Sequence, residues 1–259
     1  MPTPGRTKFL SVGCNGCHGN AGANATFAVG NNRNFNTGVE ASRNAALANF
    51  PHDGGFGTTA QLDGSFGDGT FNTPPLIEAA DTGPFFHTAT TISGASAHNT
   101  PVATTIEEAV AFYNSPAFRG GPFVMTPTEI DNIGRFLRGL NAAFNIAIAS
   151  RRIEAVGALL DSDPFPTPME DTLKQLAVAE VQDAVRVLSE VPNLNVDAQG
   201  SLNHFIQLAT NTSGGKTTTS TTDSGPSSQL DRMRLDLATA AAALGTNLTM
   251  QIGDGVLMF

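Results

Sequence analysis

Tryptophan is absent from the 259-residue sequence, and tyrosine occurs once, at Tyr113. Cysteine is nearly absent as well, since Cys14 and Cys17 are the only two. Charged residues make up only 14% of the chain, with a net charge of −9. Because no basic patch stands out, nucleic acid is not an expected partner. No run of about 18 apolar residues occurs, so no membrane span is expected.

The N-terminal residues MPTPGRTKF lack the apolar stretch of a signal peptide. Either a signal has been removed from this numbering or the sequence is a fragment. The acidic balance of the chain suits a protein that docks to basic partners.

The sequence pattern favours a mainly α fold. A short helix is expected near residues 1–13, followed by ordered loops with few strands over residues 20–100, which are rich in Asn, Gly, Thr and Phe. Loops of such length in a compact domain usually surround a ligand or metal. The stretch TTIEEAVAFYNS, from Thr104, has apolar residues at helical spacing and acidic residues in its first turn, which predicts a helix.

The longest predicted helix starts at a capping box formed by Thr126 and Glu129, with Pro127 in the first turn. It covers MTPTEIDNIGRFLRGLNAAFNIAIAS. Its apolar stripe is expected to comprise Ile130, Ile133, Phe136, Leu137, Leu140 and Phe144.

A helical extension is expected over residues 149–259. Thr167, Pro168 and Glu170 repeat the cap pattern at the start of a helix. A further helix over SLNHFIQLAT, a polar low-complexity linker near 211–229 and a last helix that ends at Gly245 complete the extension. The buried face of the first of these helices is expected to comprise Leu173, Leu176, Ala177 and Val181.

The stretch SVGCNGCHGN places Cys14, Cys17 and His18 in the C-x-x-C-H form of covalent haem c attachment. Two thiols at this spacing reach the two vinyl groups on one porphyrin edge, and the adjacent histidine supplies the proximal nitrogen to the iron. We therefore expect residues 1–148 to form a cytochrome c-like domain with long loops around one haem. Because haem c is attached outside the cytoplasmic membrane, the motif favours a periplasmic or exported protein.

Two other interpretations of the motif stay open. A zinc site needs four ligands, and the sequence has neither a second cysteine pair nor three further ligands near His18. A redox pair of the thioredoxin type would follow a strand and open a helix, whereas Gly and Asn surround both cysteines here.

Four further segments follow the motif: RNFNTGVE (33–40), FNTPPLIEAADTGPFFH (71–87), TTIEEAVAFYN (104–114) and MTPTEIDNIGRFLRGLN (125–141). In this order they resemble the second haem domain of the bacterial di-haem cytochrome c peroxidase / MauG family. That family has another C-x-x-C-H in an N-terminal domain, whereas this chain has one such motif. It also has His-Asp-Gly where this chain has His87-Thr88-Ala89.

The resemblance implies a sixth ligand to the haem iron. The position of Tyr113 carries Met in the peroxidases and Tyr in MauG-like members. A phenolate favours ferric or higher iron and lowers the potential. Met125 is the alternative sixth ligand. Each residue also has a plain structural interpretation, Tyr113 as a packed aromatic and Met125 as a core filler.

The resemblance also implies contacts around the haem. His87 matches a haem-pocket histidine, and the backbone carbonyls of Thr82 and Pro84 match a calcium site between two domains. Arg33 is a candidate partner for a haem propionate, since arginine suits carboxylates, with an exposed Arg33 as the alternative.

Three functions are compatible with these features. The chain is expected to relay electrons through one haem, with a redox partner of the cytochrome or cupredoxin type that docks to the acidic surface. The first alternative is a peroxidase or MauG-type enzyme whose peroxide-handling haem lies on a second haem domain or subunit. The second is an assembly subunit in which the extension builds an interface and the haem is auxiliary.

Overall fold

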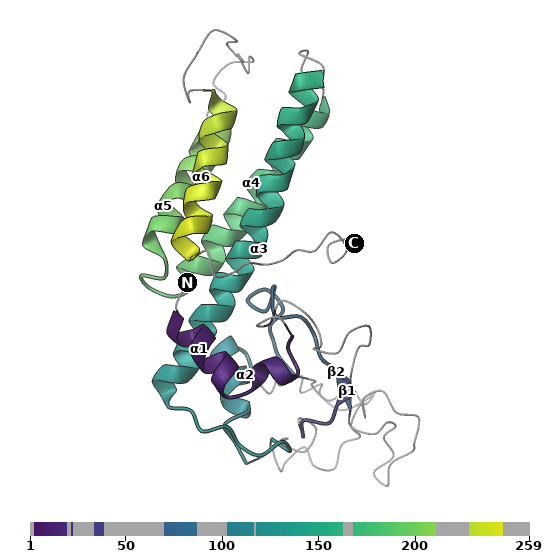
Figure 1. The fold of residues 1–259 in the computed structure, drawn as a ribbon, viewed down its shortest axis with the longest axis vertical. Coiled ribbons are helices and arrows are strands. Elements are labelled where there is room, and N and C mark those ends of the chain that lie inside the picture. The colour runs from purple at the N-terminus through teal and green to yellow at the C-terminus, as the bar shows by residue number, and fades with distance from the viewer. Residues whose placement is uncertain are drawn as a thin grey trace, which may run out of the picture. The chain divides into compact units, whose positions relative to one another are not determined.

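The computed structural model describes residues 3–19, 22, 34–38, 70–86, 103–116, 118–162, 168–210 and 228–245 (Figure 1). Within these residues the chain has six α-helices, one 3₁₀ helix and two short strands, which confirms the predicted mainly α class.

The chain divides into two compact units, Pro2–Leu137 and Arg138–Phe259. The sequence predicted a domain boundary at residue 148. The two compact units meet at residue 137 instead, because Ala142 and Ile146 already pack into the core of the second unit.

The first unit is built from short elements. Phe35 of one strand lies opposite Phe71 of the other in an antiparallel pair. Most of the predicted loop region 20–100 lies outside the described residues. The elements are α1 (Thr3–Ser11), η1 (Cys14–Gly16), β1 (Asn34–Phe35), β2 (Phe71–Asn72), α2 (Ile106–Phe112) and the first turns of α3 (Pro127–Ser162).

The two helices predicted in this unit from Thr104 and from Thr126 are confirmed, and the structure adds a capping box at Thr105 that was not predicted. The Thr105 hydroxyl accepts the backbone N–H of Glu108 at 3.1 Å, so α2 begins at Ile106 rather than at Thr104. At the start of α3, the Thr126 hydroxyl accepts the N–H of Glu129 at 3.3 Å, and the Glu129 carboxylate accepts the N–H of Thr126 at 2.8 Å.

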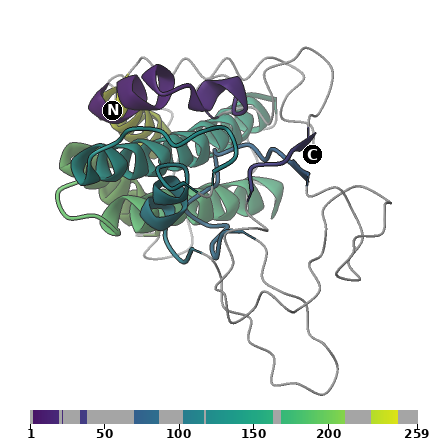
Figure 2. The same cartoon turned by 90° about the horizontal axis from the view of Figure 1, so that it is seen from below.

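The helix α1 packs against the first turns of α3 (Figures 1 and 2). A Cβ at Gly5 would collide with the backbone carbonyl of Asn132, so this close approach requires glycine. The ring of Phe9 packs on Phe136 with centroids 5.6 Å apart. These contacts hold the C-terminal end of α1, and the turn that follows it, on α3.

The helix α3 is longer than predicted. Five of the six residues of its predicted apolar stripe are buried, and Ile130 is partly buried. The helix continues past residue 150 to Ser162, because Ile153 and Val156 extend the buried stripe.

The second unit contains the rest of α3 together with α4 (Pro168–Ser189), α5 (Val196–Thr210) and α6 (Gln229–Leu244). The helix α5 packs against both α4 and α6 (Figure 1). The predicted cap at Thr167 and most of the predicted linker lie outside the described residues. The last helix, predicted over SQLDRMRLDLATAAAALG, is confirmed: the Ser228 hydroxyl caps α6 by accepting the N–H of Asp231 at 3.1 Å, and Gly245 follows its end.

The predicted buried face of α4 is right for Ala177 and Val181 and wrong for Leu176, which is 44% exposed. The buried positions of α4 repeat at Ala177, Val181, Ala184 and Leu188. Leu176 precedes this stripe by one residue, a rotation of about 100° around the helix, which turns it away from the core.

Polar contacts join α3 to α4 within the second unit. Arg138 donates to Glu190 at 2.9 Å, and Arg152 donates to Glu180 at 2.7 Å. The buried side chain of Asn145 donates to Asp183 at 2.5 Å. Among the described helices, none is both long enough and apolar enough to cross a bilayer.

Candidate functional site

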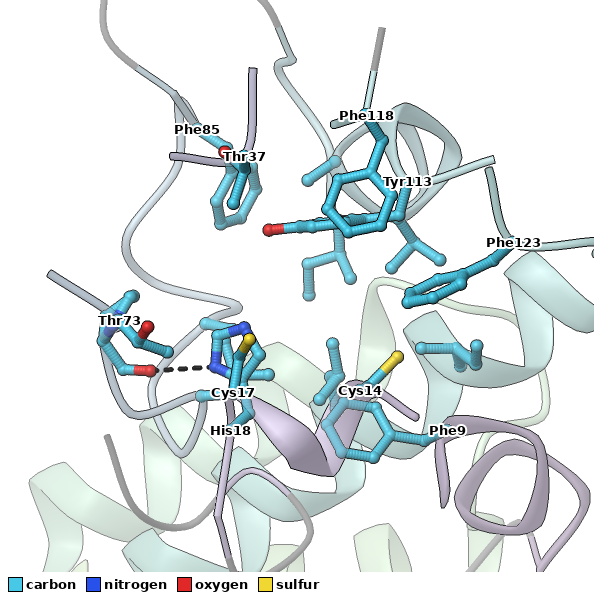
Figure 3. A pocket seen from close by; sticks show the side chains of 18 of the residues that line it. Phe9, Cys14, Cys17, His18, Thr37, Thr73, Phe85, Tyr113, Phe118 and Phe123 are labelled. Atoms are coloured by element: carbon cyan, nitrogen blue, oxygen red, sulfur yellow. Dashed lines mark hydrogen bonds between the residues drawn. The ribbon is translucent and has the colours of Figure 1, made fainter. Parts of the chain in front are cut away.

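The C-x-x-C-H motif lies on the turn that follows α1. Gly13 has φ of 91°, a left-handed conformation that favours glycine, and it leads the chain into η1. The backbone carbonyl of Cys14 then accepts the N–H of Cys17 at 3.2 Å and that of His18 at 2.9 Å. This tight turn brings both thiols and the imidazole to one cavity (Figure 3).

The cavity lies wholly within the first unit and has a volume of about 310 Å³. Cofactor sites commonly range from about 300 to 1,000 Å³ and are mostly apolar. Phenylalanines from segments far apart in the sequence line this cavity. They are Phe9, Phe35, Phe71, Phe85, Phe86, Phe118 and Phe123.

His18 is held by one hydrogen bond. Its Nδ1 lies 3.0 Å from the backbone carbonyl oxygen of Pro74, which can only accept, so Nδ1 carries the proton. Burial lowers the pKa of His18, and the bond to Pro74 offsets part of that shift. The ring is therefore neutral at neutral pH, with the Nε2 lone pair available, as a metal ligand requires.

Both thiols are protonated at neutral pH. Burial raises the pKa of Cys14 to about 12, against a smaller lowering by a backbone hydrogen bond, and burial also raises the pKa of Cys17. A redox-active pair needs a lowered thiol pKa, so these shifts oppose the dithiol interpretation. Within the described residues, no three His, Cys, Asp or Glu side chains converge to hold a metal, so the zinc interpretation gains no support there.

Tyr113 enters the cavity from the side opposite His18, with its hydroxyl directed inward (Figure 3). It is the C-cap residue of α2. Burial raises the pKa of its phenol to about 12, and the charges of Cys14 and Cys17 add to the shift. None of the described residues forms a hydrogen bond with the phenol oxygen.

The other predicted site residues have different outcomes. Met125 is 6% exposed and lines the same cavity. Thr82 and Pro84 are exposed, and the Thr82 hydroxyl donates to the carbonyl of Ala79 at 3.4 Å, so the calcium site stays a prediction. The predictions for Arg33 and His87 lie outside the described residues.

Sequence reasoning missed two residues of the site. Pro74 orients His18 from 56 positions along the chain, and no local pattern links the two. Asn114 binds the backbone of Met125 with both ends of its amide. The phenylalanine wall had one available signal, since 17 phenylalanines occur in a chain without tryptophan.

Comparisons of the chain with protein-family models, with curated proteins and with solved structures give no match. The resemblance to the di-haem family therefore stays a prediction. The geometry of the cavity, with two thiols and a neutral imidazole on one side and a phenol on the other, is the basis for the functional conclusion.

Proposed function

We propose that the chain is a c-type cytochrome that holds one haem covalently in the first unit and relays electrons through it. The supporting observation is that Cys14, Cys17 and His18 line the same apolar cavity that Tyr113 enters from the opposite side. In this proposal Pro2–Leu137 has a cytochrome c-like fold, as the resemblance to the second haem domain of the di-haem cytochrome c peroxidase / MauG family implies.

The residues of the cavity fit a haem. Protonated Cys14 and Cys17 suit the addition of S–H across two vinyl groups, which consumes no oxidant or reductant. Neutral His18, oriented by Pro74, offers Nε2 as the proximal ligand. When bound, the group supplies an iron that cycles between the ferrous and ferric states. The phenylalanines make the lining of the cavity mostly apolar, which would strengthen the effect of a charge held within it.

Tyr113 is the proposed sixth ligand, with Met125 as the alternative. The phenol has no hydrogen bond to any described residue, although burial makes its ionisation unfavourable. If His18 and Tyr113 held a ferric haem, its positive charge would stabilise the anionic form of the phenol against this cost. A hard phenolate ligand would then favour the ferric state and a low potential.

Electron transfer is favoured over peroxide chemistry at this site. The rings of Phe118 and Phe123 pack against Tyr113 with centroid distances of 5.1 and 6.3 Å, so aromatic side chains occupy the space beside the phenol. If both His18 and Tyr113 held the haem, these two residues would leave no position at which a substrate could bind it. The expected partner is a small redox protein of the cytochrome or cupredoxin type.

A peroxidase or MauG-type enzyme is the second candidate, and the identity of Tyr113 favours it. A phenolate stabilises highly oxidised iron, which such chemistry requires. A second haem domain or subunit would then handle peroxide. The remaining alternative, an assembly subunit with an auxiliary haem, would use the helices of the second unit as its interface.

The direct test is to express the chain with a haem c maturation system and an export signal, and then to measure mass and optical spectrum. We expect a mass increase of one haem and a haem c absorption spectrum after reduction in alkaline pyridine. The variant Cys14→Ala/Cys17→Ala should lack the covalent mass. A colourless wild-type chain would refute the proposal. An unchanged spectrum on addition of peroxide separates electron transfer from the enzyme, and a single size at all concentrations excludes the assembly subunit.

A further inference from the structure

A closed loop surrounds Tyr113. After α2 the chain turns away through residues 114–122 and returns, so that the N–H of Phe123 donates to the carbonyl of Tyr113 at 2.9 Å. Ala117 lies outside the described residues, whereas residues 114–116 and 118–122 are described. The return brings Phe123 and Met125 beside the end of α2.

Asn114 closes this loop with both ends of its side-chain amide. Its Oδ1 accepts the N–H of Met125 at 2.8 Å, and its Nδ2 donates to the carbonyl of Met125 at 3.0 Å. An amide can do this because it carries a donor and an acceptor side by side, like the backbone of a neighbouring strand. Aspartate keeps the acceptor and lacks the donor, and alanine lacks both.

The loop holds two aromatic rings against Tyr113. The Phe118 ring lies edge-on at a centroid distance of 5.1 Å, the Phe123 ring stacks at 6.3 Å, and these two phenylalanines contact each other at 5.1 Å. Because Tyr113 is the C-cap of α2, no following helical turn supports its ring. Phe112 and Phe86 contact the ring from outside the loop at 5.3 and 6.3 Å. The loop therefore supplies two of the four described phenylalanine rings that hold the phenol.

We propose that Asn114 is the positioning residue for Tyr113. By closing the loop it keeps Phe118 and Phe123 on the tyrosine ring and keeps the hydroxyl opposite His18. The inference rests on the proposed function at one point, which is that the Tyr113 hydroxyl is a ligand of the haem iron. The closure of the loop by Asn114 is independent of that ligand.

The test uses the haem-loaded full chain and the variants Asn114→Asp and Asn114→Ala. The control is Asn145→Ala, which removes a buried asparagine hydrogen bond to Asp183 in the second unit. Since Tyr113 is the only tyrosine and no tryptophan is present, every tyrosine signal comes from this site. Ultraviolet resonance Raman reports phenolate ligation, and the rate of nitration by tetranitromethane reports access to the ring.

We expect the iron-bound phenolate signal to fall in the order wild type, Asn114→Asp, Asn114→Ala, and to stay unchanged in Asn145→Ala. Loss of both hydrogen bonds should raise the ratio of displaced to ligated tyrosine by roughly tenfold or more. Nitration should accelerate in the same order. If Asn114→Ala fails to fold, the comparison of Asn114→Asp with wild type carries the test.

The outcomes separate the two ideas. If the wild-type protein shows no signal of an iron-bound phenolate, Tyr113 is not the ligand. The nitration rates alone then decide the role of Asn114. An unchanged nitration rate in both Asn114 variants overturns the positioning role in that case. A phenolate signal that survives unchanged in Asn114→Ala overturns it when the ligand is present.

Discussion

The two units of the chain differ in what completes their cores. In the second unit, Val181, Leu202 and Phe205 are fully buried against other side chains of α3 to α6. In the first unit, elements of two to nine residues and the start of α3 surround a cavity of about 310 Å³. Side chains that face a void lose their packing partners on that side. Among the described residues, the side chains of the second core therefore pack on one another, whereas those of the first unit border an open space.

This difference indicates that the residues of the second unit serve packing, whereas those of the first unit line a cavity. The second unit repeats small aliphatic residues at helical spacing, which is what packing alone requires. The first unit places a cysteine pair, a histidine and a tyrosine around a space of cofactor size. Four experiments can break or sharpen this contrast.

The largest effect is expected from removing the two cysteines through which we propose that haem is attached. In the full-length variant Cys14→Ala/Cys17→Ala, amide hydrogens of the described part of residues 2–137 should lose most of their protection from exchange. The amide hydrogens of α4, α5 and α6 should keep their protection, because the core of these helices is made of their own side chains and those of α3. Hydrogen exchange with mass spectrometry, against the haem-loaded wild type, makes the comparison. Equal protection of both units would end the distinction.

A cavity made in the second unit should lower stability without changing the haem. Phe205 is 0% exposed, and Phe205→Ala should cost about 3–5 kcal/mol in the free energy of unfolding of the bundle. The matched control Leu235→Ala, at a residue that is 62% exposed, should change it by about 0.5 kcal/mol or less. Urea titration followed by circular dichroism measures both. A Phe205→Ala protein with an altered haem spectrum before unfolding would show that the two units are coupled.

Alkaline titration of Tyr113 tests what completes the first unit. If iron binds the phenolate, the loaded protein should show no phenol ionisation step up to pH 12, measured by ultraviolet difference absorbance. A folded phenol without iron should instead titrate at about 12, because burial raises its pKa from the ordinary 10.0. Stability would then be complete below pH 10 and lost as pH rises through about 12, since the folded pKa exceeds the unfolded one.

The smallest effect concerns the contact of α1 with α3. Glu129 pairs with Lys8 at 2.8 Å, and this bond, together with those from Thr126, lowers the pKa of Glu129 to about 2. Because the folded pKa lies below the ordinary 4.5, the stabilisation is present above pH 4.5 and is lost as pH falls through about 2. Glu129→Gln should melt slightly below wild type at neutral pH and match it near pH 2. A gap in melting temperature that persists in acid would assign the effect to the cap rather than to the charge.

Features set by neighbours in the chain were predictable. The capping boxes at Thr105 and Thr126 involve residues three positions apart, so their patterns could be read locally. The attachment motif is equally local. Leu176 was misplaced because an apolar residue one position off the stripe fits a helical pattern almost as well as one on it.

Contacts between distant segments were not predictable from the sequence. The carbonyl of Pro74 has no side-chain chemistry that marks it as the partner of His18. Asn114 has the composition of any turn residue, and its role depends on a chain return eleven residues later. Local periodicity holds no information about which segments a fold will bring together.

The sequence alone determined the helices and their caps, and it predicts the chemistry through the C-x-x-C-H motif, because each depends on residues within one or two turns of one another. Tertiary structure alone decided that Cys14, His18 and Tyr113 border one cavity, with a phenylalanine wall around them. That arrangement depends on packing between segments up to about a hundred residues apart in the chain, as between Cys14 and Tyr113, and only the folded chain sets such distances.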